Sequence, residues 1–433
     1  MGHAPGEYEH QCGRQEPAVP LGPGCILRQV RHRDGQVLGP RPQETSAMKI
    51  LFVAPWIPSK IRPRSLALLE ILARDHQIHF LGLTSSDEEV RQAQELPVES
   101  TVLVPRNRIT SMLRCATALP TGTSLQQAYA DVPELTAALA SEIRQWQPDV
   151  VHLNVFRTVH LVERCAPVPV IVDLDEFRSE YYSQLAQTAG PKWKLVGRIE
   201  APRMQAREDA LVAHQVPLMV SAPFEPGEER PNTYVVRSPY DHPEDATPRA
   251  AEPRVLFVGR LTYEANVNGL LWFLRNCWSE VKRRVPNAVL DIVGTNPPAS
   301  VQAFRGNGVE IHANVPDVAP YYSPASAAIV PVWRGTGVQM KLIQALAAGV
   351  PTVTTPEVAR RAGVRHDHEV VVGADAQAWV DELTSVLTDP ARGQRLAAAG
   401  KRWALDFHSS NAVREQLAKA YAAVWPHPEQ FRR

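Results

Sequence analysis

Short apolar strands alternate with amphipathic helices along nearly the whole chain, and this alternation limits the fold more than any other feature of the sequence. In the first half we expect strands at 50–54, 77–83, 100–104, 150–153, 170–173, 218–221 and 234–236. The helices we expect between these strands lie near 65–74, 133–146 and 202–214. Such alternation is typical of a parallel sheet with helices on both faces.

A second set of alternations follows a break. Residues 237–253 are rich in prolines and charges and are interpreted as a linker. After them we expect strands at 254–258, 289–293, 309–312 and 327–330, with a helix at 266–285. Apolar residues recur in that helix at helical spacing and predict one broad buried face. The chain therefore predicts two α/β domains.

Composition agrees with two domains and excludes several classes of protein. At 433 residues the chain is long enough for two packed cores, and its 46 basic and 46 acidic residues give no sign of nucleic-acid binding. The five cysteines are scattered, without C-x-x-C spacing, which argues against a disulfide framework or zinc site and fits the reducing cytoplasm. No apolar run reaches the roughly 18 residues of a membrane span. The five cysteines mentioned above are Cys12, Cys25, Cys115, Cys165 and Cys277.

The first 47 residues differ from the rest. They are rich in Pro, Gly, Gln, Arg and His and lack apolar periodicity, so we expect a disordered extension. Met48 opens the first apolar strand, and we interpret it as the true start of the protein.

A glycine-bounded loop and helix at 334–351 predict a phosphate site. Gly335 and Gly337 allow a tight turn, and a helix beginning near Val338 adds unpaired amides and the positive end of its dipole. Lys341 and Gln344 are three residues apart and share one face of that helix. The alternative is an ordinary lysine on a core helix.

Several ordered motifs resemble the glycosyltransferase family 4, especially its bacterial branch associated with exopolysaccharide assembly. The stretch 335–351 fits Gly-Thr-Gly-x-x-x-Lys-x-x-(Glu/Gln)-Ala-x-Ala-x-Gly-x-Pro, and further similarity lies at 257–267, 290–294 and 315–322. The resemblance covers most of 48–407. It implies the GT-B fold, in which two Rossmann-like doubly wound domains face each other across a cleft.

This resemblance also implies domain roles. Residues 48–236 would form the acceptor-side domain and 254–407 the nucleotide-sugar domain, while 408–433 would hold a helix, expected at 410–424, that crosses back to the first. The implied activity is retaining transfer of a sugar from a UDP- or GDP-sugar to a hydroxyl or similar nucleophile on a polysaccharide, lipid-linked or small-metabolite acceptor. Neither a metal nor another cofactor is expected. The alternative is a non-catalytic or divergent GT-B protein that only binds nucleotide-sugar.

On the donor side the resemblance assigns individual residues. Lys341 and Arg260 would hold the diphosphate, and Gln344 would meet the ribose hydroxyls. The sequence departs from the family at Thr336 and Gln344, where carboxylates are usual. The other expected donor contacts, including backbone amides at 336–338, come from Asn266, Val315, Thr336, Gly337 and Val338.

Polar residues at two strand ends of the first half are further candidates. We expect catalytic roles for His152, Asn154 and Asp175, and an acceptor-side role for Glu176. Asp173 and Asp175 spell D-x-D, a metal motif in another glycosyltransferase architecture; we prefer carboxylates lining the cleft, with Asp175 and Glu176 nearest the acceptor. His152 and Asn154 end the strand at 150–153, where relatives often place a polar residue near the reacting sugar. Their alternative is a hydrogen-bonded structural role.

Two basic segments complete the candidates. Arg62 and Arg64 follow the first strand, and either face the acceptor in the cleft or belong to a solvated loop. Residues 106–119 are basic and partly apolar, which fits a helix lying on a bilayer, although we favour a packed helix. A cytoplasmic protein is expected, with a peripheral membrane contact left open.

Overall fold

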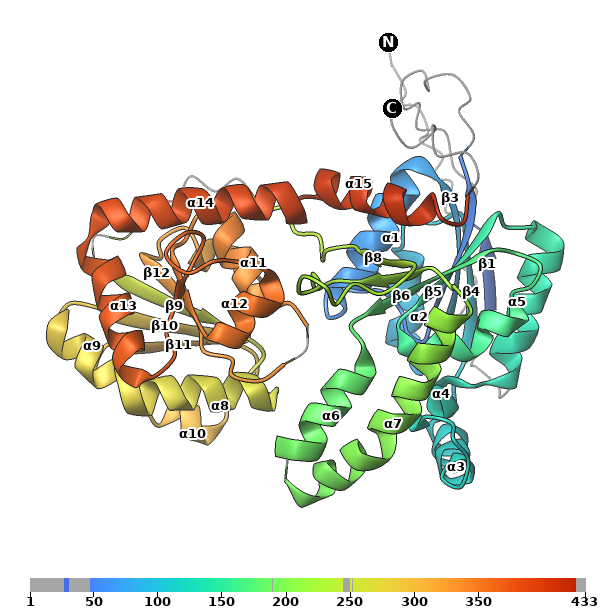
Figure 1. The fold of residues 1–433 in the computed structure, drawn as a ribbon, viewed down its shortest axis with the longest axis horizontal. Coiled ribbons are helices and arrows are strands. Elements are labelled where there is room, and N and C mark those ends of the chain that lie inside the picture. Colours follow the sequence, from blue (N-terminus) through green and yellow to red (C-terminus); the bar gives the residue numbers. More distant parts are fainter. Residues whose placement is uncertain are drawn as a thin grey trace, which may run out of the picture.

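The structure, a computed structural model, describes residues 27–30, 47–188, 190–243, 250, 252–335 and 337–425. Two α/β domains lie side by side and are bridged along one edge by the last two helices (Figure 1). Each domain has a sheet with helices on both faces, which confirms the GT-B architecture.

The first domain contains an eight-stranded sheet in the order β1-β4-β3-β2-β5-β6-β7-β8. All neighbours are parallel except β1, which runs antiparallel to β4 at one edge. The strands are β1 (Leu27–Val30), β2 (Lys49–Ala54), β3 (Gln77–Thr84), β4 (Ser100–Pro105), β5 (Val150–Asn154), β6 (Val170–Asp175), β7 (Leu218–Val220) and β8 (Thr233–Val235). Buried Val, Ile, Leu and Phe side chains fill both faces, as expected for a covered parallel sheet.

Its helices include several that the sequence analysis did not predict. The first-domain helices are α1 (Pro63–Asp75), α2 (Asp87–Gln94), α3 (Arg108–Ala118), α4 (Leu125–Ala130), α5 (Pro133–Trp146), the 3₁₀ helix η1 (Phe156–Arg164), α6 (Arg178–Thr188) and α7 (Pro191–Ala213). The helix predicted at 202–214 is therefore much longer. Pro202 lies inside α7 rather than starting it. At Gly197 the two long helices touch, because an added Cβ would lie 2.5 Å from the carbonyl oxygen of Tyr182 in α6.

A six-stranded parallel sheet, in the order β11-β10-β9-β12-β13-β14, forms the second domain. Its strands are β9 (Arg254–Val258), β10 (Val289–Gly294), β11 (Val309–Ala313), β12 (Ala327–Val330), β13 (Thr352–Thr354) and β14 (Val371–Val372). The predicted helix at 266–285 is one run of α8 (Glu264–Phe273), the π-helical turn η2 (Leu274–Trp278) and α9 (Ser279–Arg284). Its apolar face packs on the sheet as expected. The other helices are α10 (Ala299–Gln302), η3 (Ala319–Tyr321), α11 (Met340–Ala347), α12 (Pro356–Ala362), α13 (Ala376–Thr388), α14 (Pro390–His408) and α15 (Ser410–Tyr421).

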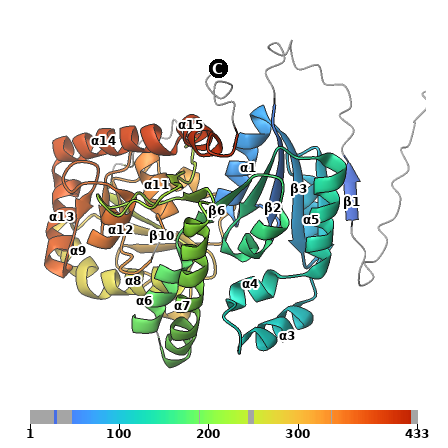
Figure 2. The ribbon, with the colours of Figure 1, turned by 45° about the vertical axis from the view of Figure 1, so that its right-hand side comes forward.

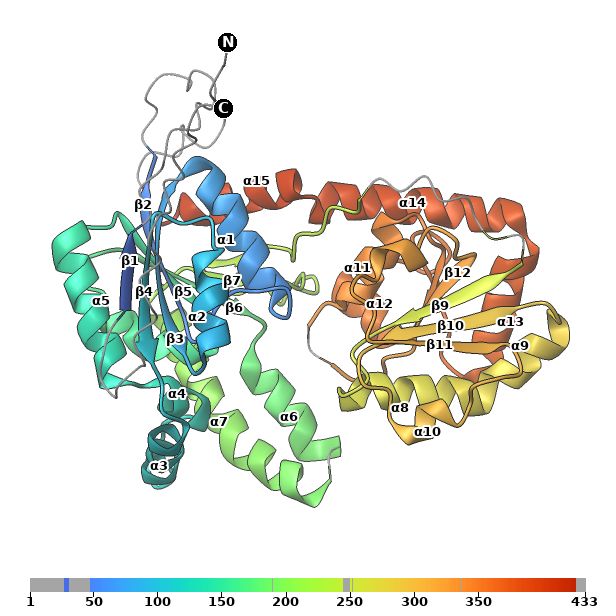
Figure 3. The ribbon, with the colours of Figure 1, turned by 180° about the vertical axis from the view of Figure 1, so that it is seen from behind.

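Helix α15 returns to the first domain (Figure 3). Val413, Leu417 and Tyr421 are buried in the core cluster that contains strand β2 and helix α1. Arg414 also pairs with Asp75 at the end of α1, with N–O distances of 2.5 and 2.9 Å. The C-terminal segment therefore belongs structurally to the first domain.

The N-terminal expectation needs one change. Residues 27–30 form strand β1 and pair with β4, so these four residues are not disordered. Residues 1–26 and 31–46 lie outside the described residues. Between β8 and β9, the described residues 236–243, 250 and 252–253 form neither helix nor strand, and the linker at 237–253 stays a prediction.

Candidate functional site

The donor candidates follow the carboxyl ends of three strands of the second sheet, of which β9 and β12 are neighbours while β10 separates β9 from β11. Arg260 follows β9, Val315 follows β11, and the glycine loop follows β12. Val315 is partly buried and packs against an apolar cluster that includes Val258 and Tyr322. Ligands of open α/β sheets bind at this edge, so the fold places these residues where a ligand site is expected.

The glycine loop leads directly into helix α11. The helix begins at Met340, two residues later than predicted, so Gly337 and Val338 lie in the loop before its first turn. No side-chain cap bonds to the first amides of α11. Thr336 lies outside the described residues, so its part in the donor site stays a prediction.

Lys341 is held by two neutral amides. Its Nζ donates to Asn266 Oδ1 and to Gln339 Oε1, each at 2.9 Å. Asn266 in turn donates from Nδ2 to the carbonyl oxygen of Arg260 at 2.9 Å. Gly259 permits this approach, because an added Cβ would lie 3.1 Å from Asn266 Nδ2. Three residues assigned from the sequence thus form one connected group.

The charge in this group is uncompensated within the described part of the chain. No carboxylate there pairs with Lys341 or Arg260, and the Lys341 ammonium has amide oxygens as its partners. Desolvation by burial lowers the pKa of Lys341 to about 8. Arg260 is exposed, and its positive charge helps to lower the pKa of Arg62 in the first domain, after the larger effect of burial. The arrangement favours an anion near Lys341 and Arg260.

Gln344 has a protein partner. Tyr322, which is almost fully buried, donates its hydroxyl to Gln344 Oε1 at 3.1 Å. Burial also raises the pKa of that hydroxyl, which stays protonated and able to donate. A ribose hydroxyl would therefore share this oxygen or accept from the amide nitrogen.

His152 does not fit the catalytic role expected from the sequence. The side chain is fully buried, stacks on Phe52 with 4.3 Å between ring centroids, and is hydrogen-bonded through Nδ1 to the Tyr421 hydroxyl at 2.8 Å. Burial lowers its pKa to about 3, so the ring is neutral at pH 7. This correction favours the structural alternative, in which His152 joins β5 to α15.

Arg64 and Asn154 also need correction, because both belong to a buried network around Asp173. Arg64 reaches Asp173 through Nη2 at 2.7 Å and Nε at 3.2 Å, and donates to the Val236 carbonyl at 2.8 Å. Asn154 Nδ2 donates to Asp173 at 3.2 Å, and its Oδ1 accepts from Ser65 at 2.7 Å. Arg64 therefore lies neither in a solvated loop nor at an acceptor surface. The Asp173 carboxylate already accepts hydrogen bonds from the Arg64 guanidinium and the Asn154 amide. A carboxylate with these partners does not fit the role of ligand to a divalent cation.

The remaining acceptor candidates face the other domain. Asp175 ends β6 with a side chain 42% exposed, and its carboxylate lies 3.3 Å from Arg64 Nε. Glu176 extends to the glycine loop, because a Cβ added at Gly337 would lie 3.2 Å from Glu176 Oε2. Arg178 pairs with Glu176 from the same segment. The structure thus brings Glu176 and Arg62 close to the donor group, whereas Asp175 pairs with Arg64 of its own domain.

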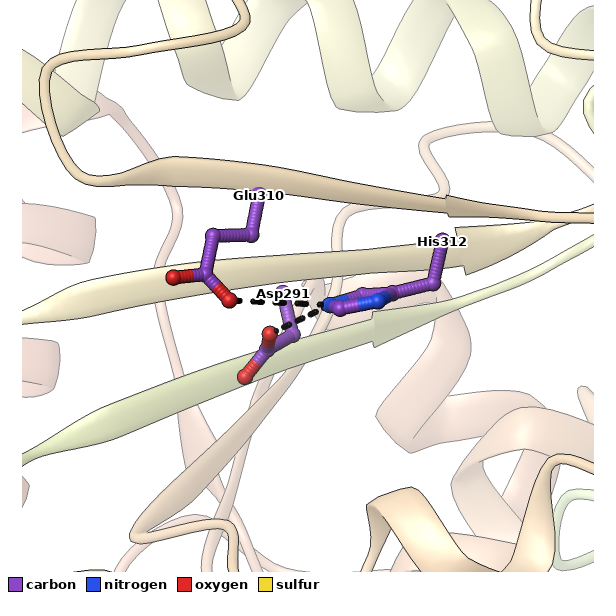
Figure 4. A group of neighbouring side chains, drawn as sticks. All are labelled: Asp291, Glu310 and His312. Carbon is purple, nitrogen blue, oxygen red and sulfur yellow. Dashed lines mark hydrogen bonds and ion pairs between the residues drawn. The ribbon is translucent and has the colours of Figure 1, made fainter.

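Figure 4 shows an acidic group that the sequence analysis missed, formed by Asp291, Glu310 and His312 on β10 and β11. His312 Nε2 lies 2.8 Å from Asp291 Oδ1. Arg254 donates to both oxygens of Asp291 at 2.7 and 2.8 Å and to Glu310 at 2.6 Å. Since the guanidinium already fills the position of a cation, this group is an ion-pair network that ties neighbouring strands together.

Comparison with known proteins agrees with this geometry. Residues 252–389 match the family model "Glycosyl transferases group 1", a segment that includes every donor candidate. A Klebsiella pneumoniae protein described as an uncharacterized 44.6 kDa protein in the cps region is 25% identical over 130 residues. That match covers 28% of this chain and 34% of the relative, so it spans only about a third of the relative's length.

Solved structures resemble nearly the whole chain. A glycosyltransferase from Rickettsia africae has a TM-score of 0.61 at 11% identity, covering 87% of this chain and 99% of its own. Sucrose-phosphate synthase from Thermosynechococcus elongatus gives 0.59 at 14% identity, with 87% and 99% covered. HepE from Anabaena, solved with UDP and glucose, gives 0.59 at 13% identity, with 87% and 100% covered. These likenesses show the GT-B fold, and the family match supports a glycosyltransferase.

Proposed function

We propose that this chain transfers a sugar from a UDP- or GDP-sugar, with retention of configuration, to a hydroxyl or similar nucleophile on a polysaccharide, lipid-linked or small-metabolite acceptor. The observation that carries the proposal is Lys341, a cation held by neutral amides only, beside Arg260 and the first turn of α11. A diphosphate supplies the missing negative charge.

The chemistry follows from the same residues. The bond between sugar C1 and the diphosphate oxygen breaks with its electron pair moving to the diphosphate, and a bond from the acceptor oxygen to C1 forms. The acceptor proton leaves on the departing diphosphate or to solvent. Arg260, Lys341 and the amides of α11 stabilise the charge that grows on the leaving group, and we propose that no metal is required. Glu176 reaches the glycine loop from the opposite domain, and Asp175 is next to it in the chain.

The first experiment measures donor binding and turnover separately. UDP, GDP and their sugars are titrated into the protein, and nucleotide release is then followed with and without acceptor. Lys341→Ala should weaken nucleotide binding at least about tenfold, because it removes a charge-assisted bond. Lys401→Ala, at an exposed lysine of α14 in the same domain, is the matched control. UDP is the nucleotide to test first, since HepE was solved with it. Equal affinity in both variants would place the donor elsewhere.

A second candidate function is nucleotide-sugar binding without transfer. It is favoured by Thr336 and Gln344, which replace the carboxylates usual in the family, and by the bond between Gln344 and Tyr322. Tight nucleotide binding with no acceptor-dependent release across a broad acceptor panel would support it. Release of UDP or GDP that requires an acceptor would exclude it.

We also propose a peripheral contact of helix α3 with an anionic bilayer. The segment forms a helix as expected, but its large apolar side chains do not pack: Ile109, Met112 and Leu113 are each more than 60% exposed. Arg108 and Arg114 lie among them. An apolar face with basic neighbours fits an anionic lipid surface. No helix in the described ranges is long and apolar enough to span a membrane.

A further inference from the structure

Three arginines of the first domain alternate with two aromatic rings. The guanidinium of Arg62 lies 4.9 Å from the centre of the Trp56 ring, and that of Arg157 lies 5.5 Å from the same ring. Arg157 is also 5.9 Å from the Tyr129 ring, and Arg106 is 4.7 Å from it. We call these five residues the arginine ladder. The rings hold the guanidinium groups in place by cation–π contact.

The arginine ladder lies where the first sheet faces the cleft. Trp56 follows β2, Arg106 follows β4 and Arg157 follows β5, so the ladder collects residues from the carboxyl ends of three parallel strands. Arg62 is close enough to Arg260 of the donor group for the two charges to repel each other. The ladder therefore stands opposite the donor group, on the side assigned to the acceptor.

Positive charge in the ladder is poorly compensated. Arg62 is 3.8 Å from Glu89, and this is the one carboxylate in the described residues that pairs with any of the three arginines. Arg106 donates to the Ser85 hydroxyl at 2.9 Å, while its buried Nε lacks a hydrogen-bond partner among the described residues. Arg157 donates to the neutral side chain of Gln126.

Electrostatic repulsion within the ladder also indicates that its positive charge lacks a counter-ion. Burial, followed by the charge of neighbouring arginines, lowers the pKa of both Arg62 and Arg157. Guanidinium groups that are desolvated together without counter-ions raise the free energy of the unliganded protein. The three arginines of the ladder, of which Arg62 alone pairs with a carboxylate, Glu89, leave an excess of two positive charges.

From this geometry we infer that the acceptor carries a phosphate group, which Arg62, Arg106 and Arg157 bind beside the donor group. The inference rests on the proposed function for the identity of this side as the acceptor side. A phosphate monoester carries about −1.5 to −2 charges at pH 7 and matches the excess of the ladder, whereas one carboxylate would leave a positive charge unpaired. Guanidinium groups also bind phosphate oxygens in pairs.

The test uses inorganic phosphate as the probe and the full chain saturated with UDP or GDP, so that the donor site is already filled. Phosphate binding is measured by calorimetry, with acetate at equal ionic strength as the competing anion. We expect saturable binding of phosphate that acetate does not match. Arg106→Gln and Arg157→Gln should each weaken it about tenfold or more. Arg283→Gln, at an exposed arginine of α9, should not change it.

Further measurements distinguish loss of the phosphate site from misfolding of a variant and from failure of the proposed function. Arg106→Lys keeps the charge and should retain most phosphate affinity, and every variant should bind nucleotide as the wild type does. Unchanged phosphate binding in both glutamine variants, or equal binding of acetate, would overturn the inference while the proposed function stands. Phosphate binding lost in both glutamine variants, but without sugar transfer to any phosphorylated acceptor, would uphold the ladder as a phosphate site and refute the acceptor assignment.

Discussion

The pKa of Lys341 predicts how nucleotide affinity changes with pH. In the unliganded protein this pKa is lowered to about 8 by burial. A bound diphosphate stabilises the ammonium form and raises the pKa, so the protonated lysine is the form that binds. Affinity should therefore be constant below pH 8 and fall as pH rises above it, by about tenfold per pH unit until the pKa of the complex is reached. At pH 9.5 the expected loss is about thirtyfold.

Few other groups at this site change charge over that range. Burial raises the pKa of the neighbouring Tyr263 to about 12. The terminal phosphate of UDP or GDP is already ionised over most of this range, since the second pKa of a phosphate group is about 6. The assay is calorimetric titration of UDP or GDP between pH 6.5 and 9.5. Lys341→Arg is the control, because a guanidinium keeps its charge throughout and should give a flat profile. A flat profile in the wild type would refute the assignment of Lys341 to the diphosphate.

The same pKa gives a stability effect that can be measured without any ligand. The value in the folded protein lies below the usual 10.5, so between about pH 8 and 10.5 the unfolded state binds more protons. The Lys341 contribution to the free energy of unfolding should then rise with pH across this window. Lys341→Met should abolish that contribution, which urea unfolding at pH 7.5 and 10 can resolve.

Three further predictions follow from the site and from α3. Chelator should leave turnover unchanged, because Arg64 and Asn154 already occupy the Asp173 carboxylate; a requirement for added Mn²⁺ or Mg²⁺ would contradict this assignment. Gln344→Leu should weaken nucleotide binding by about 1 to 3 kcal/mol, as measured by calorimetry, whereas Gln344→Glu should bind equally or more tightly. If Gln344→Leu bound nucleotide normally and Gln344→Glu bound it more weakly, the amide would have a structural role only, as the partner of Tyr322. Replacing Leu113 by Glu should reduce sedimentation with anionic vesicles, and unchanged sedimentation would exclude α3 as the contact.

All strands except β1, β13 and β14, and the grouping of Lys341 with the glycine loop, could be predicted because their signals are local. Apolar runs mark the buried strands, and the order of Gly337, Lys341 and Gln344 fixes which groups share the loop and one helix face. Asn266, which the sequence analysis assigned to the donor side from a separate motif, contacts Lys341. Helices α13 and α14 were missed although Asp375 and Asp389 cap them, a signal that the sequence contains.

On the acceptor side, the errors come from contacts between residues far apart in the chain. Arg64 and Asp173 are separated by 109 positions, and His152 and Tyr421 by 269. Whether such a residue faces solvent or a buried partner depends on the packing of whole elements, which periodicity does not specify. An arginine after a strand is compatible with both a cleft and a core, and here Arg62 and Arg64, two residues apart, take opposite roles.

The arginine ladder shows what a sequence pattern would need to contain for such a site to be found. Arg106 and Arg157 each follow a strand by one to three residues, as Arg62 follows β2 less closely, but nothing in the sequence says that the three strands are near one another. The parallel order β4-β3-β2-β5 brings their carboxyl ends to one edge. The Trp56 and Tyr129 rings contact the guanidinium groups by cation–π interaction. Because an aromatic ring is neutral, this contact does not neutralise the arginine charge, which can still attract an anion. Arginine after several strands of one parallel sheet, without acidic partners nearby, is therefore a pattern from which an anion site can be predicted once strand order is known.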